Sequence, residues 1–277
     1  MPQLKMTPLS NDRWLKSLFM FSAAIWLAMM TGSVDASGRL PEFTASYGIE
    51  KYGVKLAEAT YTLSRTQDGY RFNQETRLSG MASLFSDDSI SAVSIIQAGE
   101  NGMLLKKHRY VQTGKEKNRD EDFSIEWNRN AQGLSGRITG VVRSQPVDLE
   151  VDKPVWDMLS FQIPLMQEAS DDRKRYPYYA LLKGELDTYF FDLVATEDIE
   201  FAGKKYRALK LVRVNPEKKR ELRIWLLPEL NNIPAVVENM RDGKQHSYMK
   251  IESVSFEGKT PIADNTGNSL DNGDDEF

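Results

Sequence analysis

Cysteine is absent from this sequence of 277 residues, and histidine occurs only twice. The absence of cysteine excludes disulfides, a lipid-modified N-terminal cysteine, a thiol nucleophile and thiolate metal sites. A domain of this size can bury enough apolar surface to fold without disulfides. The net charge is only −4. No basic field is present to neutralise phosphates, so nucleic acid is not an expected partner.

Residues 1–36 have the composition of a secretory signal peptide. Basic residues, the last of them Lys16, precede an apolar run at 18–30, and small residues flank Asp35. The run is shorter than the roughly 20 residues of a membrane-spanning helix, although an uncleaved anchor is the alternative. We expect cleavage after Ala36 and no transmembrane segment in the mature chain. The expected location is the bacterial periplasm, with full secretion as the other possibility.

Beyond Ser37, apolar and polar residues alternate between turn signals, a pattern typical of β-strands. Asp68-Gly69 is a strong hairpin signal. The pattern predicts a single β-rich domain over residues 37–257. The expected strands are 43–49, 54–64, 70–78, 88–97, 102–113, 122–127, 134–143, 146–151, 178–182, 186–197, 199–201, 206–214, 221–227, 235–240 and 245–256.

One stretch, 152–167, interrupts the alternation. Asp152 can cap a helix, and Pro154 suits its first turn. Apolar side chains at three- and four-residue spacing, with aromatic residues between them, make the stretch apolar nearly all round. The spacing therefore predicts a buried helix over 152–167 that Pro164 kinks or ends.

The expected antiparallel strands make a sheet too wide to remain flat. We expect a mainly β fold: a curved antiparallel sheet, or half-open β-barrel, with one apolar helix covering its concave face. Residues 258–277 are acidic and rich in turn residues. They carry too little apolar surface to offset the entropy of ordering, so the sequence predicts a disordered acidic tail there.

The second half of the chain carries a recognisable order of elements. An apolar helix with the sequence Trp-Asp-Met-Leu-Ser-Phe is followed by a strand pair through Gly203-Lys-Lys-Tyr206. The strand Ile224-Trp225-Leu226 comes next, and Pro234 reopens a strand that ends in Glu238. This order resembles the envelope proteins grouped as domain of unknown function 3108, over residues 40–257.

The strand–proline–strand corner is also similar to one in the periplasmic lipoprotein carriers of the Lol type. Those carriers resemble a half-open β-barrel with a helical lid over an apolar cavity. The two resemblances imply a fold that binds an apolar ligand or a polypeptide. They transfer no catalytic residue, because a fold does not determine a function.

Catalytic residues are not indicated. His108 and His246 stand among cations and polar residues in expected strands, so we expect both to be exposed and structural rather than general bases. Asp157 and Glu238 lie near aromatic residues and could form the carboxylate pair of a sugar hydrolase. Most such acids are solvated or cap turns. No metal-ligand spacing and no phosphate-binding loop is present, so we expect neither a metal nor a cofactor.

Apolar residues suggest a binding site instead. The stretch 152–167 is either core packing or a movable lid whose methionine side chains adapt to a ligand. The corner between Pro228 and Pro234 would form the rim of a cavity beside this stretch. Prolines are tolerated there because missing amide donors cost little at a strand end. The expected lining is Trp156, Leu159, Phe161, Trp225, Leu226 and Leu227, with Trp225 as a rim anchor or an outer-face aromatic.

The leading hypothesis is therefore non-catalytic binding of an apolar ligand, such as a lipid or acyl chain, by a carrier. The second is an envelope assembly or interaction factor that recruits a protein partner through exposed strand edges. The third is a periplasmic hydrolase. A continuous apolar cavity would favour the first hypothesis. A filled core with an exposed apolar edge would favour the second. Carboxylates clustered around a histidine in a cleft would favour the third.

Overall fold

The computed structural model describes residues 39–264, apart from 85, 87, 100–101, 115–118, 132 and 216. The chain divides into two units, Met1–Arg39 and Leu40–Phe277, and every element named below belongs to the second. The expected signal peptide at 1–36 lies outside the described residues, as does the end of the expected tail.

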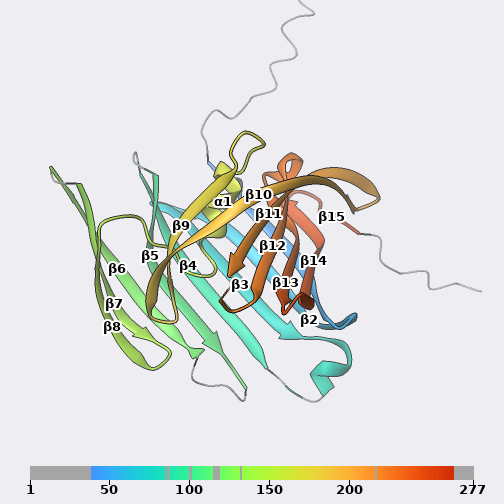
Figure 1. The fold of residues 1–277 in the computed structure, drawn as a ribbon, viewed down its shortest axis with the longest axis horizontal. Coiled ribbons are helices and arrows are strands. Elements are labelled where there is room, and N and C mark those ends of the chain that lie inside the picture. The colour runs from blue at the N-terminus through green and yellow to red at the C-terminus, as the bar shows by residue number, and fades with distance from the viewer. Residues whose placement is uncertain are drawn as a thin grey trace, which may run out of the picture. The chain divides into compact units, whose positions relative to one another are not determined.

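Eight successive strands form the first half of one antiparallel sheet (Figure 1). From β2 onward, each pairs with the strand that precedes it in the chain. They are β1 (Phe43–Lys51), β2 (Val54–Thr66), β3 (Gly69–Leu78), β4 (Ser89–Gly99), β5 (Gly102–Gln112), β6 (Glu121–Asn130), β7 (Gly133–Val142) and β8 (Gln145–Val151).

Six further strands form the second half, where each strand from β10 onward pairs with the one before it. They are β9 (Arg175–Leu182), β10 (Glu185–Phe201), β11 (Lys204–Asn215), β12 (Arg220–Leu227), β13 (Ile233–Arg241) and β14 (Lys244–Phe256). The two halves are joined by β1 and β14, which pair from Phe43↔Phe256 to Glu50↔Tyr248. This order makes β8 and β9 the end strands of an open sheet.

The sheet curves, and its inner face encloses the hydrophobic core. Figure 1 shows β9 and β10 crossing in front of the helix α1 (Gln162–Glu168). One cluster of buried side chains includes Phe72 and Phe123 from the first half, Leu165 from α1, and Tyr176 from the second half. The predicted class is therefore confirmed: a mainly β, curved antiparallel sheet with a single α-helix in the described part of the chain.

The alternation of apolar and polar residues along each strand determines which side chains face the core, as the sequence predicts. In β1 the side chains of Phe43, Ala45 and Tyr47 are buried and those between them are more exposed. The predicted segments 186–197 and 199–201 form the single strand β10, because Asp198 continues the pleat and pairs with β11. Side-chain periodicity thus locates the strands well.

The predicted helix over 152–167 is wrong in its bounds. Residues 152–156 lie outside any helix, and Trp156 forms an isolated parallel bridge with Ala180 of β9. The helix α1 starts later and is shorter. Pro164 falls within its first turn, where a missing amide donor breaks no intrahelical bond, so Pro164 neither kinks nor ends the helix.

The first part of the predicted disordered tail holds a short strand, β15 (Ile262–Ala263). It pairs with Val254 and Ser253 of β14. Asp264 follows, and its carboxylate lies 3.2 Å from Nζ of Lys250. A strand of two residues is too short to show a periodic pattern. The polar, acidic composition of the segment therefore predicts disorder instead. Residues 265–277 lie outside the described residues.

Candidate functional site

Four polar side chains are buried together on the inner face of the sheet: Ser94 of β4, His108 of β5, and Asp157 and Ser160 before α1. Asp157 Oδ2 accepts hydrogen bonds from Ser94 Oγ at 2.8 Å and from Ser160 Oγ at 2.6 Å. Asp157 Oδ1 lies 3.3 Å from His108 Nδ1. We call these four residues the polar cluster. It joins the chain before α1 to two strands of the first half of the sheet.

Asp157 occupies its place for a local reason. The backbone N–H groups of Leu159 and Ser160 donate to its Oδ1 at 2.6 and 2.8 Å, and Ser160 Oγ accepts from the N–H of Asp157 at 3.1 Å. This reciprocal arrangement is a capping box. Asp157 therefore caps the turn that leads into α1, a role that the sequence pattern predicts for Asp152.

The other end of α1 is held by Asn232, in the turn between β12 and β13. Its side-chain Nδ2 donates to the backbone carbonyls of Met166 at 2.8 Å and of Ala169 at 3.0 Å. The last carbonyls of a helix have no partner within it, so Asn232 acts as a C-terminal cap. The corner between Pro228 and Pro234 thus positions α1. This contact and the polar cluster favour fixed core over a movable lid for the helix itself.

His108 is buried, so the prediction that it is exposed is wrong. The cause is a β-bulge in β5: Ile96 pairs with Leu105, but Ile95 pairs with Lys107, which leaves Lys106 as the extra residue. A bulge shifts the alternation by one residue. Leu105 and His108 can then both face the core. The prediction for His246 is confirmed, since it is exposed on β14.

The electrostatics of the cluster favour an ion pair. Burial lowers the pKa of His108, but the Asp157 carboxylate beside it more than offsets this effect, so the pKa is raised. Burial acts to raise the pKa of Asp157, yet His108 and the hydrogen bonds from Ser160 bring it down to about 2. Glu121, whose pKa burial raises, adds a further negative charge near His108 as it ionises.

Ser94, His108 and Asp157 are the residue types of a catalytic triad, but their geometry is different. Ser94 Oγ lies 3.0 Å from His108 Nδ1, the same nitrogen that faces Asp157. In a triad the serine and the carboxylate use opposite ring nitrogens. All three side chains are also buried, so the Ser94 hydroxyl is not exposed as a nucleophile. The polar cluster therefore attaches the turn before α1 to β4 and β5, and its geometry is not that of an activated nucleophile.

The predicted carboxylate pair is not brought together. Asp157 belongs to the polar cluster on the inner face. Glu238 of β13 pairs in register with Arg223, Nη1 of which lies 3.5 Å from its carboxylate, and Gln245 donates to it at 3.1 Å. These contacts place Glu238 on the opposite face of the sheet.

The structure separates the predicted lining residues. Trp156, Leu159, Leu226 and Leu227 are buried in the core. Trp225 is also buried, but on the other face of β12 from its neighbour Leu226. There its indole Nε1 donates to Glu197 at 2.7 Å, and Lys210 Nζ lies 4.7 Å from its ring. Trp225 is therefore an outer-face aromatic, and of the six residues only Phe161 reaches an apolar depression.

That depression lies where β10 and β11 diverge. The two strands pair only from Asp192↔Val212 onward, while residues 185–191 of β10 pair with β9 alone. The ring of Phe161 stacks on that of Phe191 with centroids 5.3 Å apart. We call this depression the aromatic fork. It is lined by Asp157, Met158, Phe161, Tyr178, Ala180, Leu182, Tyr189, Phe191, Arg213 and Leu222.

The aromatic fork is nearly closed. Its volume is about 20 Å³, which is room for about one water molecule. Met158 forms part of its lining and is 57% exposed. Arg213 faces it from β11, in register with Leu222. The sequence offers a signal for Arg213, because Leu209, Leu211 and Arg213 alternate on the inward side of one strand.

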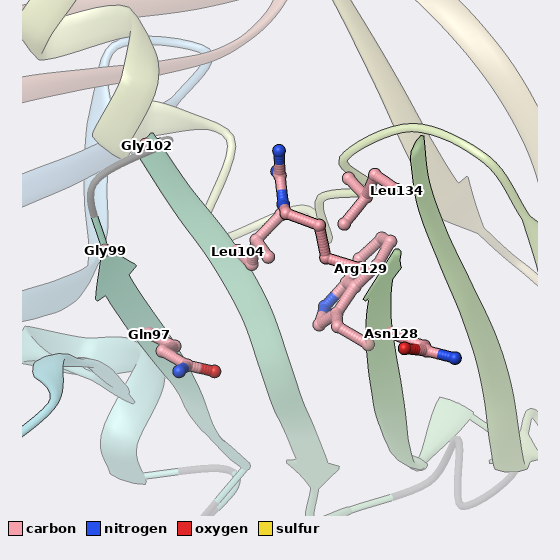
Figure 2. A pocket seen from close by; sticks show the side chains of 8 residues that line it. Gln97, Gly99, Gly102, Leu104, Asn128, Arg129 and Leu134 are labelled. Carbon is pink, nitrogen blue, oxygen red and sulfur yellow. The ribbon is translucent and has the colours of Figure 1, made fainter. Parts of the chain in front are cut away.

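A second, more open groove lies between β5 and β6. These strands pair only from Lys107↔Ser124 to Tyr110↔Glu121 and then separate. Trp127 Nε1 donates across the gap to the carbonyl of Leu105 at 2.7 Å. Figure 2 shows Leu104 and Leu134 on the two sides of this groove, with Arg129 between them. Its volume is about 210 Å³. We call it the β5–β6 groove.

Two negative findings apply to the described ranges of the chain. No group of three or more His, Asp or Glu side chains there is arranged to hold a metal ion. No helix in that part of the protein has the length and apolar character needed to cross a membrane.

The fold and its sites define an open, curved β-sheet protein with a capped helix across its inner face. The sequence matches the family described as "Protein of unknown function (DUF3108)" over residues 42–250, so the chain belongs to that family. Neither a curated protein nor a solved structure matches the chain significantly.

Proposed function

We propose that this protein is a non-catalytic binding protein of the bacterial periplasm that takes an apolar ligand, a lipid or acyl chain, at the aromatic fork. The observation that carries the proposal is the lining of the fork, where aromatic side chains from three elements meet at the point where two strands separate. Ligand sites are mostly apolar, with a few polar groups that orient the ligand. Arg213 is such a group.

Ligand entry requires side chains to move, because ligand pockets have volumes of several hundred Å³ and the fork is nearly closed. Met158 is flexible and largely exposed. Phe161 is only partly buried and packs by stacking on Phe191. An apolar chain that displaces both side chains would take over the stacking on Phe191. The capped helix α1 remains in place in this scheme.

The periplasmic location rests on the signal-peptide pattern of residues 1–36. We expect the protein recovered from the periplasmic fraction of an expressing bacterium to begin at Ser37. Intact mass measurement tests this. Recovery of the full-length chain in the membrane fraction would support the uncleaved anchor instead.

Native mass spectrometry tests ligand binding. The protein is purified without detergent from the cells that express it, and bound molecules are extracted with organic solvent. We expect a stoichiometric lipid that is lost in Phe161→Asp and retained in Val54→Asp, a change at an exposed apolar residue of β2 far along the sheet from the fork. A ligand-free mass that persists after incubation with envelope lipids would contradict the proposal.

The β5–β6 groove supports a second candidate function, recruitment of a protein partner. The facing edges of the two strands carry backbone groups that do not pair with each other beyond Lys107↔Ser124. Such edges can accept an extended peptide by strand addition. A photo-crosslinking residue in place of Leu134 would then give a defined adduct in cells, whereas one in place of Val54 would not.

A further inference from the structure

Arg213 has no anionic partner among the described residues, in contrast to Arg137 and Arg175. Arg137 and Arg175 each form two hydrogen bonds with one carboxylate, that of Asp148 and of Asp192 respectively. Arg213 forms no ion pair and no hydrogen bond with any residue that the structure describes. Its guanidinium lies 3.8 Å from the ring centroid of Tyr189.

The position of Arg213 makes this lack of a partner costly. The side chain is half-buried, and burial lowers its pKa. Asp187 acts on it in the opposite direction through space, but Asp187 forms no ion pair with it and instead accepts a hydrogen bond from the N–H of Thr188. A partly desolvated guanidinium gains more from an anion than an exposed one does.

The surroundings of Arg213 are mostly apolar on the side of α1, where Asp157, fully buried and hydrogen-bonded within the polar cluster, is the one carboxylate that borders the fork. Phe161, Phe191 and Leu222 line the fork beside it. An apolar chain that displaces Phe161 and lies against Phe191 and Leu222 would place its end group near the guanidinium. The fork therefore combines an apolar surface with one cation that has five donors in a planar arrangement, the geometry that matches carboxylate and phosphate oxygens.

We propose that the ligand of the aromatic fork is an anionic amphiphile, an apolar chain that ends in a carboxylate or a phosphate monoester, and that Arg213 binds its head group. This inference rests on the proposed function and names the chemical class of the ligand. Tyr189 holds the guanidinium in position by stacking. The apolar chain supplies affinity, and Arg213 supplies the preference for an acid over a neutral lipid.

Calorimetric titration of the lipid-stripped full chain with three probes of equal chain length tests this. The probes are dodecanoate, dodecyl phosphate and dodecanol, each below its micellar concentration. We expect one or both acids to bind at least about tenfold more tightly than the alcohol, the factor that corresponds to one charge-assisted hydrogen bond. In Arg213→Gln the acids should bind as weakly as the alcohol, while binding of the alcohol should not change.

Arg207→Gln is the matched control. Arg207 lies on the same strand, but it is exposed and pairs with Asp171 at 2.7 Å. We expect this variant to keep the preference for acids. Equal binding of all three probes by the unmodified protein would overturn the inference and leave apolar binding intact. Binding of none of them would contradict both proposals, and this result does not depend on whether Arg213→Gln folds.

Discussion

His108 Nδ1 lies 3.3 Å from Asp157 Oδ1, and both side chains are shielded from solvent. The contact joins β5 to the turn before α1, two segments that are distant in the sequence. Because Asp157 also caps that turn, one carboxylate fixes both the local conformation of the chain and its attachment to the sheet.

We expect Asp157→Asn to lower the free energy of unfolding by about 3 kcal/mol, since removing one partner leaves the other charge buried and unpaired. Urea denaturation measures this change. Asp148→Asn is the control, because Asp148 is exposed on the sheet surface and pairs with Arg137 there. That variant should change stability little. Equal losses in the two variants would show that Asp157 is not a buried anchor.

The stability supplied by His108 should depend on pH. Its raised folded-state pKa stabilises the fold fully below the unfolded value of about 6.5, and this contribution is lost as the pH rises through the folded value. Asp157, with a pKa of about 2, contributes above its unfolded value of about 3.9 and loses that contribution as the pH falls through 2. Asp157, Glu121 and Asp122 are the acids that act on His108.

The measurement compares His108→Gln with the unmodified protein in urea at a series of pH values. We expect the difference in unfolding free energy to be largest between about pH 4 and 6.5, and to shrink towards pH 9. A difference that stays constant across this range would mean that the pKa of His108 is the same in the folded and the unfolded protein.

Asn232→Gly should destabilise the protein by about 1–2 kcal/mol, the contribution of two hydrogen bonds that cap α1. Asn231→Gly is a close control. Both asparagines have a positive φ, of 55° and 56°, so glycine relieves the same backbone strain at each position. Only Asn232 donates to α1. Thermal unfolding of the two variants separates the effects, and equal melting temperatures would refute the capping role.

Gly136→Ala should disturb the packing beside the β5–β6 groove. A Cβ atom at Gly136 would lie 2.6 Å from Cε3 of Trp127, which is too close for contact. We expect a loss of about 1–3 kcal/mol from overpacking and a shift in tryptophan fluorescence. Gly99→Ala, at a position with no atom within 4 Å of the added Cβ, should leave both stability and fluorescence nearly unchanged. The opposite order of effects would contradict the packing seen here.

The sequence predicts the strands well, because each one alternates over enough residues to show its buried face. It also predicts a helix across the concave face, but with the wrong start. Asp152 and Pro154 give an N-terminal signal, yet Asp157 and Ser160 give a competing capping box. The capping box is used because Trp156 pairs with β9 and holds the preceding residues out of a helix.

The site could be predicted only in part. The sequence predicts Phe161 as a lining residue, but the burial of His108 depends on a bulge at Lys106 that no local pattern reveals. Arg213 stands at an inward position that the alternation of β11 does indicate. Its half-buried state depends on the divergence of β10 from β11, which is a tertiary feature. A single sequence without a structure does not locate the point at which two paired strands separate.

The pairing of β1 with β14 has a consequence for how the chain folds. β1 can pair with one of its two neighbours only after β14, about 200 residues later in the chain, has been synthesised. Closing so long a loop is slow in proteins dominated by non-local contacts. A chain that ends before Lys244 lacks β14, so its two half-sheets would not be joined. The two halves of the sheet can therefore join only after β14 has been synthesised.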